Sequence, residues 1–142
     1  IRNDVYFHES IFFENKTRKV NAHDFEYSFK RITNKDIASP GSWVMNNVES
    51  FKAVNDSIFE INLKEGFNSF IEILTMKYCS VVPKEVIQSI GDSFSKNPIG
   101  TGPFKFKRWD DNIKMVLTKN ENYFEIDRFT ISRWNFYQIH TR

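Results

Sequence analysis

The sequence lacks the residues on which several classes of protein depend. It contains a single cysteine, Cys79, so neither an internal disulfide nor a cysteine-based metal cage can form within the chain. Its three histidines, His8, His23 and His140, are far apart and show no metal-ligand spacing such as His-x-x-x-His. We therefore expect neither a metal ion nor a cofactor. Cys79 has apolar neighbours and is expected to be a small buried residue.

Long hydrophobic runs and clusters of like charge are also missing. No apolar run approaches the roughly 20 residues that a membrane-spanning helix needs. The 20 basic and 18 acidic residues are interspersed and leave a net charge of +2. Basic residues gather only at 105–109 (KFKRW), and alternation along a strand explains this segment better than a phosphate-binding stripe. Nucleic acid is therefore not an expected partner.

No arrangement of nucleophile, acid and base stands out. Gly-x-Ser-x-Gly is absent, and the adjacent Asp110 and Asp111 would point to opposite faces of a strand. The glycines of 100–102 are followed by a proline and a strand-like segment, whereas a phosphate loop needs a helix N-terminus there. A hydrolase that uses His8 or His23 is an alternative without a supporting spacing of nucleophile and base.

Aromatic side chains are abundant, at 16% of the residues, and 15 of them are phenylalanines. A chain of 142 residues is long enough to bury a real core. Most of these rings must fill that core, and a minority could line a ligand cleft.

The clearest predicted element is a helix over 22–32. Asn21 is a good N-cap, and Asp24 stands three residues later, where a carboxylate favours the helix dipole. The residues Phe25, Phe29 and Ile32 follow at helical spacing and predict one buried stripe.

Two further helices are expected to be short. Asn68 is expected to cap the first, whose inward residues would be Phe70, Ile73 and Leu74. Pro83 suits the first position of the second, and Gly91 is its expected stop. A polar loop is expected over 92–98.

Hydrophobic alternation predicts hairpins. The expected strands are 48–54, 58–64, 103–109, 114–118 and 129–132. The first 20 residues also look extended, with a second short strand expected at 11–13.

The three tryptophans differ in their surroundings. Trp109 ends a strand, so core packing is favoured. Trp134 lies near the end of the segment, and any exposure of its ring is attributed to a missing partner segment. Trp43 follows the turn signal at 39–42, and loop aromatics serve ligand surfaces more often than strand aromatics do. Both readings stay open for Trp43, with packing of the loop slightly ahead of ligand contact.

Several segments carry a resemblance in their order and spacing. They are 1–8 (IRNDVYFH), 20–31 (VNAHDFEYSFKR), 38–40 (ASP), 81–84 (VVPK), 97–106 (NPIGTGPFKF) and 120–124 (NENYF), with Trp109 between the last two. Together they resemble the bacterial family 5 solute-binding proteins, which include the oligopeptide- and dipeptide-binding proteins. The sequence departs from the family at His8-Glu9-Ser10, where a histidine-aspartate-glycine turn is usual, and over 11–19, which look longer and more aromatic.

The resemblance implies an α+β chain that forms the small lobe of a type II periplasmic-binding-protein-like fold. A mixed or antiparallel sheet would carry three short helices. Strands of 1–20 would enter the lobe, 21–98 would form the small α/β lobe, and 99–142 would return toward the first main lobe. Because Ile1 already stands in a strand-like segment, we expect an internal piece of a longer protein, with any targeting signal upstream.

The resemblance also implies a function. The protein would be the substrate-binding component of an ABC importer, periplasmic or lipid-anchored on the outer face of the cytoplasmic membrane. It would capture peptides or other small solutes and deliver them to permease subunits, and it would not be an enzyme. Relatives carry dipeptides, longer peptides, nickel complexes, haem and sugars, so the ligand itself is not predicted.

Ser42 and Trp43 are the ligand-binding candidates, because the resemblance places the loop after the first helix nearest the cleft. The acidic anchor for a peptide amino terminus would lie in the other lobe. A module for protein interaction or sensing on the same fold is the alternative. Cut strand edges would favour self-association of such a segment.

Overall fold

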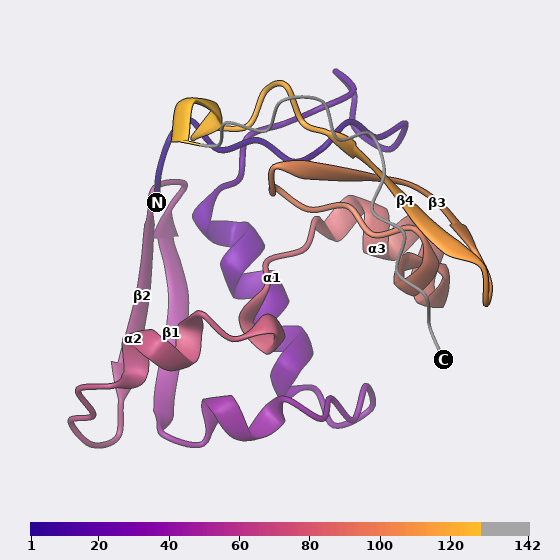
Figure 1. Ribbon diagram of the computed structural model, residues 1–142. Coiled ribbons are helices and arrows are strands. Elements are labelled where there is room, and N and C mark those ends of the chain that lie inside the picture. The colour runs from indigo at the N-terminus through magenta and orange to yellow at the C-terminus, as the bar shows by residue number, and fades with distance from the viewer. Residues whose placement is uncertain (129–142) are drawn as a thin grey trace. The chain divides into compact units, whose positions relative to one another are not determined.

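The structure is a computed structural model that describes residues 1–128 and combines helices with two antiparallel hairpins (Figure 1). Its α-helices are α1 (Ala22–Thr33), α2 (Phe70–Leu74) and α3 (Lys84–Ile90). Short 3-10 helices cover Ser42–Met45, Lys77–Cys79, Gly91–Lys96 and Ile126–Arg128. Strand β1 (Val48–Asn55) pairs with β2 (Ile58–Leu63), and β3 (Phe104–Asp110) pairs with β4 (Lys114–Lys119).

The α+β class and the antiparallel pairing are confirmed, with one difference in architecture. Within residues 1–128 the strands form two separate two-stranded ribbons, and each ribbon pairs only strands that are neighbours in sequence.

The chain divides into two compact units. The first unit consists of Ile1–Asn3 and Asn21–Lys84, and the second of Asp4–Val20 and 85–142, of which 85–128 are described. The division predicted from the sequence, at 1–20, 21–98 and 99–142, stays a prediction.

Helix α1 begins where the sequence predicts. The Asn21 side-chain oxygen accepts from the backbone N–H groups of His23 and Asp24, at 3.1 and 3.3 Å. The Asp24 carboxylate in turn accepts from the Asn21 backbone N–H at 3.0 Å, which completes a capping box. The helix extends one residue beyond the predicted 22–32 and ends at Thr33.

The core of the first unit forms where α1 lies against the β1–β2 ribbon (Figure 1). Phe29 of α1 is 2% exposed, and its ring meets Phe51 and Phe59 edge-on at 5.7 and 5.2 Å. Such pairs contribute about 0.5–1.5 kcal/mol each beyond their buried area. Cys79 belongs to the same cluster and is 7% exposed, so its prediction as a buried residue is confirmed.

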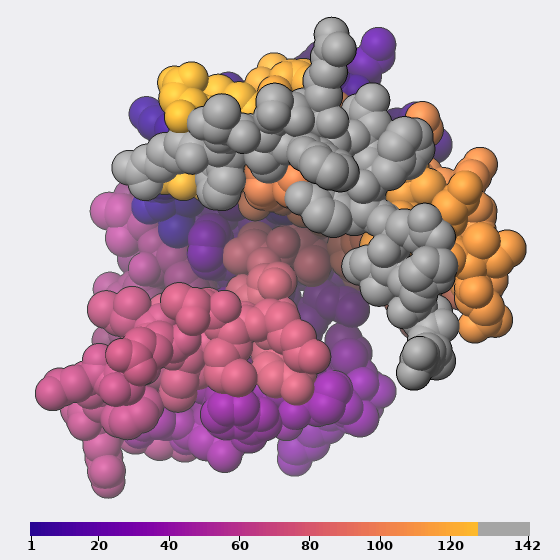
Figure 2. Space-filling model, in the orientation of Figure 1, coloured from indigo at the N-terminus to yellow at the C-terminus, as the bar shows by residue number. Residues whose placement is uncertain are grey.

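The β1–β2 hairpin closes through the turn chemistry that the sequence indicates. The Asn55 side-chain oxygen accepts from the backbone N–H groups of Ser57 and Ile58, both at 2.9 Å. Helix α2 follows this ribbon on the surface of the first unit (Figure 2), and its Ile71 is 75% exposed.

The prediction of Asn68 as a helix cap is wrong. Helix α2 begins at Phe70, so the cap position falls on Ser69, whose side chain makes no capping bond. The helix has five residues, and carbonyl groups of the preceding turn accept hydrogen bonds from its first backbone N–H groups. The Phe70 N–H donates to the Phe67 carbonyl at 3.1 Å.

Gly91 ends α3 as predicted, with a positive φ of 52° that favours glycine. The polar loop expected over 92–98 is wrong, because Gly91–Lys96 continues as a 3-10 helix. The Ser95 hydroxyl donates to the Asp92 carbonyl at 2.8 Å, and such local bonds let short polar residues hold a tight turn.

The amino-terminal segment of the second unit is extended but pairs little. Its only isolated bridge among the described residues joins Tyr6 and Lys19. The strand expected at 11–13 is wrong, because the Ser10 N–H donates to the Lys16 carbonyl at 2.6 Å and folds these residues into a turn. Ile11 is 91% exposed at that turn.

Core packing of Trp109 is also wrong, since this side chain is 37% exposed. The prediction rested on the position of Trp109 at the end of a strand, and the register between β3 and β4 shifts just before it, between Phe106 and Arg108. The strand expected at 129–132, Trp134 and His140 lie outside the described residues.

Arg18 holds the amino-terminal segment against α3 within the second unit. Its guanidinium donates twice to the Glu85 carboxylate, with both N–O distances at 2.7 Å. It also lies over the rings of Phe7 and Phe13, at 5.0 and 5.4 Å from their centroids. This two-bond geometry is specific to arginine and fixes the direction of approach.

Replacing Asn21 with alanine should lower the free energy of unfolding by about 1 kcal/mol, because two backbone N–H groups lose their acceptor. Urea unfolding followed by circular dichroism measures the change. The matched control is Asn68→Ala, which should change stability by less than about 0.5 kcal/mol because Asn68 is exposed and caps no helix. Equal losses in both variants would contradict the assigned cap.

Candidate functional site

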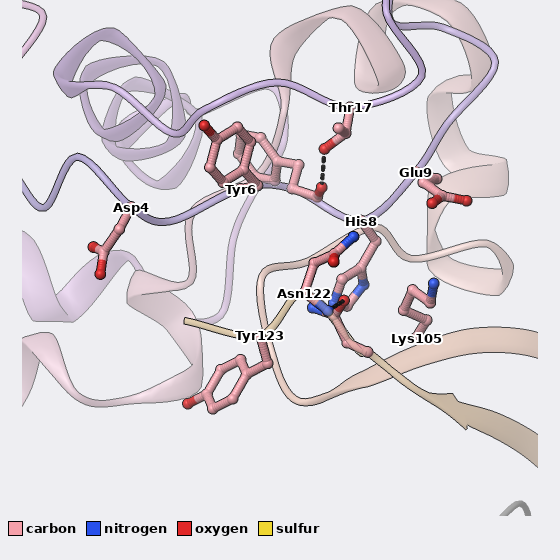
Figure 3. A pocket seen from close by; sticks show the side chains of 10 residues that line it. Asp4, Tyr6, His8, Glu9, Thr17, Lys105, Asn122 and Tyr123 are labelled. Carbon is pink, nitrogen blue, oxygen red and sulfur yellow. Dashed lines mark hydrogen bonds between the residues drawn. The ribbon is translucent and has the colours of Figure 1, made fainter. Parts of the chain in front are cut away.

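The second unit contains a cavity of about 400 Å³ with a polar lining (Figure 3). It lies between the amino-terminal segment and the open end of the β3–β4 ribbon, where β3 begins and β4 ends. The polar side chains that line it are Asp4, Tyr6, His8, Glu9, Thr17, Lys105, Asn120, Asn122 and Tyr123. Figure 3 shows His8 and Asn122 together at its centre, with Lys105 to one side.

His8 is held in the wall of this cavity by hydrogen bonds at both its backbone and its ring. The ring Nε2 lies 2.9 Å from the carbonyl oxygen of Gly102, and the backbone N–H donates to Gly100 at 2.8 Å. A carbonyl oxygen only accepts, so Nε2 carries the proton. The Asn120 amide donates to the same Gly102 oxygen at 3.1 Å. His8 is therefore a hydrogen-bonding residue that links the amino-terminal segment to 100–102.

The surroundings of His8 favour its neutral form. Burial is the largest cause that lowers the pKa of His8 below its usual value, the hydrogen bond to Gly102 opposes it, and the positive charge of Lys105 lowers the pKa further. With Nε2 protonated and bonded, the neutral ring fixes 100–102 beside the amino-terminal segment. His8 is therefore a structural donor in the cavity wall.

The cavity can hold a polar group but shows no machinery for covalent catalysis. Its described lining has no serine or cysteine, and the Thr17 hydroxyl donates its proton to the Phe7 carbonyl at 2.6 Å (Figure 3). No cluster of three or more His, Cys, Asp or Glu side chains suited to a metal ion occurs in residues 1–128. Nor is any helix in that range long and apolar enough to cross a membrane.

Ser42 and Trp43 lie in the first unit, at the start of the 3-10 helix Ser42–Met45. Both are exposed, and Trp43 keeps 47% of its surface accessible. The indole ring also meets the ring of Tyr78 edge-on at 6.5 Å, so it is partly packed and partly free. Their role as ligand-binding residues stays a prediction.

Tyr78 is a residue that the sequence analysis missed. The backbone of Gly41 lies against its ring so closely that a Cβ at position 41 would overlap the ring carbons. Gly41 is therefore required here for close approach. The turn signal around Gly41 was visible in the sequence, but nothing there indicated which ring would fill the space.

Lys105, Asn120 and Tyr123 were also not singled out as lining a cavity. They fall within 97–106 and 120–124, two segments noted only for their resemblance. His8 and His23 belong to different units, and His23 is exposed at the start of α1, as expected of a solvated first-turn residue.

Comparison with known proteins places the chain in a family. The model of the bacterial extracellular solute-binding proteins, family 5 Middle, matches residues 1–141, and the chain belongs to this family. The periplasmic oligopeptide-binding protein OppA of Salmonella typhimurium is 28% identical over 139 residues, which cover 84% of this chain and 26% of OppA.

Solved structures give the same result. The periplasmic binding protein DppA of Helicobacter pylori, in complex with the peptide STSA, is 29% identical with a TM-score of 0.77, covering 87% of this chain and 27% of DppA. NikZ of Campylobacter jejuni, in complex with Ni(L-His), is 26% identical with a TM-score of 0.73, covering 88% of this chain and 24% of NikZ. The chain spans about a quarter of the length of these relatives.

The buried ring of His8 predicts a dependence of stability on pH. The unfolded chain binds a proton near pH 6.5, whereas the folded chain does so only at lower pH. The free energy of unfolding should therefore fall as the pH drops below about 6.5, and this contribution should be constant above it. Urea unfolding between pH 5 and pH 8 measures the slope.

Two variants separate His8 from the other titrating groups. His8→Gln keeps a donor for the Gly102 carbonyl but does not titrate, so its slope between pH 5 and pH 6.5 should be smaller. His23→Gln, at an exposed histidine of the first unit, is the matched control. An unchanged slope in His8→Gln would show that another group is responsible.

Proposed function

We propose that this chain is an internal segment of the substrate-binding component of an ABC importer. The protein captures peptides or similar small solutes outside the cytoplasmic membrane, in the periplasm or anchored by lipid on the outer face. It delivers them to the permease subunits of the importer. The observation that carries the proposal is the family match over residues 1–141, supported by relatives whose names describe oligopeptide and peptide binding.

The extent of the match supports the proposal that the segment is part of a larger two-lobed protein. Since the chain spans about a quarter of its relatives, other segments complete the solute site. In this proposal 1–20 enter the small lobe, 21–98 form it, and 99–142 return toward the first main lobe. A lobe alone buries too little of a ligand to hold it tightly, so binding belongs to the whole protein.

Binding without turnover fits the described residues better than catalysis. The polar cavity around His8 has no activated nucleophile, and its histidine is already bonded to a carbonyl. A binding protein needs instead a surface with aromatic area and free polar groups. Ser42 and Trp43 offer such a surface in the first unit, because the Trp43 ring is half exposed and held on one edge by Tyr78.

Replacing Trp43 with alanine in the protein that contains this chain should weaken peptide binding about tenfold, as expected when an aromatic contact residue is truncated. Isothermal titration calorimetry with the same peptide measures the affinity. The matched control is Trp109→Ala, which removes an exposed tryptophan of the second unit and should leave the affinity unchanged. An unaltered affinity in Trp43→Ala would remove this residue from the site.

The whole protein should bind peptides saturably and release them intact. Mass spectrometry of a peptide mixture incubated with the protein measures turnover, and native mass spectrometry of the purified protein reveals any co-purified solute. Cleavage products that depend on His8 or His23 would contradict the proposal and support a hydrolase.

A further inference from the structure

The first unit has a hollow of its own, distinct from the cavity of the second unit. It has a volume of about 220 Å³ and lies between the carboxyl-terminal end of α1 and the segment around the 3-10 helix Lys77–Cys79. We refer to it as the Tyr78 pocket. Six of its lining residues carry the argument that follows: Ser28, Arg31, Ser39, Lys77, Tyr78 and Ser80. A water molecule occupies about 30 Å³ in the liquid, so the pocket has room for a carboxylate and several waters.

The charge of the Tyr78 pocket has one sign. Arg31 and Lys77 both line it, and its described lining contains no carboxylate. Neither cation forms an ion pair among residues 1–128, whereas Lys30 and Lys52 of the same unit pair with Glu26 and Glu60. Two cations close to one hollow with no counter-charge favour an anionic occupant.

Aromatic rings hold both cations near the pocket. The guanidinium of Arg31 lies 6.0 Å from the ring centre of Tyr27, and the ammonium of Lys77 lies 5.4 Å from that of Tyr78. These contacts leave the N–H groups of both side chains available as donors, because a ring face attracts the cation without accepting all of its hydrogens.

The hydroxyl groups of the lining also present donors. The Ser39 oxygen accepts from the Gly41 backbone N–H at 3.3 Å, which leaves its own proton free to donate. The Ser80 hydroxyl has no partner among the described residues. The pocket therefore presents charged and hydroxyl donors beside the apolar side chains of Ile32, Ile37 and Val82, and charge-assisted donors are what a carboxylate requires.

The walls of the pocket are fixed before any ligand arrives. The buried Ser28 hydroxyl donates to the Asp24 carbonyl at 2.7 Å and accepts from the Val82 N–H at 3.0 Å, which ties α1 to the segment that leads to α3. The loop that carries Ser39 includes Ala38 with a positive φ of 48°, a strained conformation that persists only where the surrounding structure holds it.

The Tyr78 pocket also adjoins the surface assigned to solute contact. Tyr78 lines the pocket, and its ring meets Trp43 edge-on. A solute that lies on Trp43 can therefore place a charged end into the pocket. We propose that the Tyr78 pocket binds a carboxylate of the captured solute through Arg31 and Lys77, an inference that rests on the proposed function for the identity of the solute.

The first experiment tests the pocket itself, without any assumption about the solute. Acetate is titrated into the whole protein that contains this chain, at constant ionic strength with sodium chloride as the reference salt, and amide resonances are followed by NMR. Saturable shifts are expected at the backbone amides of Ser39, Lys77 and Ser80, and Arg31→Gln and Lys77→Gln should each abolish saturation. The matched control is Lys35→Gln, an exposed and unpaired cation outside the pocket, which should leave the shifts unchanged.

The second experiment connects the pocket with solute capture. Calorimetry compares trialanine with trialanine amide in the whole protein, and the free acid should bind about tenfold more tightly because a charge-assisted hydrogen bond is lost in the amide. The difference should vanish in Lys77→Gln.

The outcomes separate the two proposals. Absence of saturable acetate shifts, or shifts that persist in both variants, overturns the carboxylate pocket whatever the protein transports. Equal affinities of acid and amide overturn it as a peptide subsite. Saturable acetate binding without any peptide binding overturns the peptide capture proposed above and leaves the pocket as a site for a small free carboxylate.

Discussion

The first unit depends on the packing of one phenylalanine ring between a helix and a ribbon. Phe29 meets two rings of the β1–β2 ribbon edge-on, and this contact fixes the helix on the face of an otherwise isolated hairpin. An isolated hairpin is at best marginally stable in water, so the ribbon needs the helix as much as the helix needs the ribbon. Trp43, Tyr78 and the pocket beside them are all positioned by residues joined to this cluster.

The second unit is organised around a backbone carbonyl. The Gly102 oxygen accepts from His8 and from Asn120, which brings together two segments separated by more than 90 positions along the chain. The ion pair of Arg18 with Glu85 adds a second link between distant segments of this unit. The polar cavity is a consequence of this arrangement, because hydrogen-bonded backbone forms its wall.

The proposed capture of a solute would relate these features to one function. A binding protein must present hydrogen-bond donors and aromatic surface without activating a nucleophile. The described residues fall into two corresponding groups, those bonded to the backbone and those left accessible. Histidine, threonine and several serines are occupied with backbone groups, whereas Trp43, Arg31 and Lys77 keep surface or hydrogen atoms available. One fold can host different functions, because function belongs to the site that the fold carries.

The sequence by itself determined the local elements of this protein. The cap of α1, the two hairpins and the glycine that ends α3 all follow from interactions within a few residues, and so they were predicted correctly. The resemblance to the family could also be recognised from the sequence, because short motifs in a fixed order can be identified without knowledge of the structure. Asn68 and residues 11–13 were misassigned because neighbouring hydrogen bonds, which propensity does not reveal, decided their conformation.

Only the tertiary structure decided which distant side chains meet. Nothing in the sequence indicates that Tyr78 fills the space over Gly41, that His8 reaches Gly102, or that Trp109 stays exposed. Contacts of this kind depend on the directions in which the side chains of packed helices and strands point. Those directions depend on how the whole core is packed. The pocket with two unpaired cations is such a feature, since Arg31 and Lys77 approach one hollow only after the chain has folded.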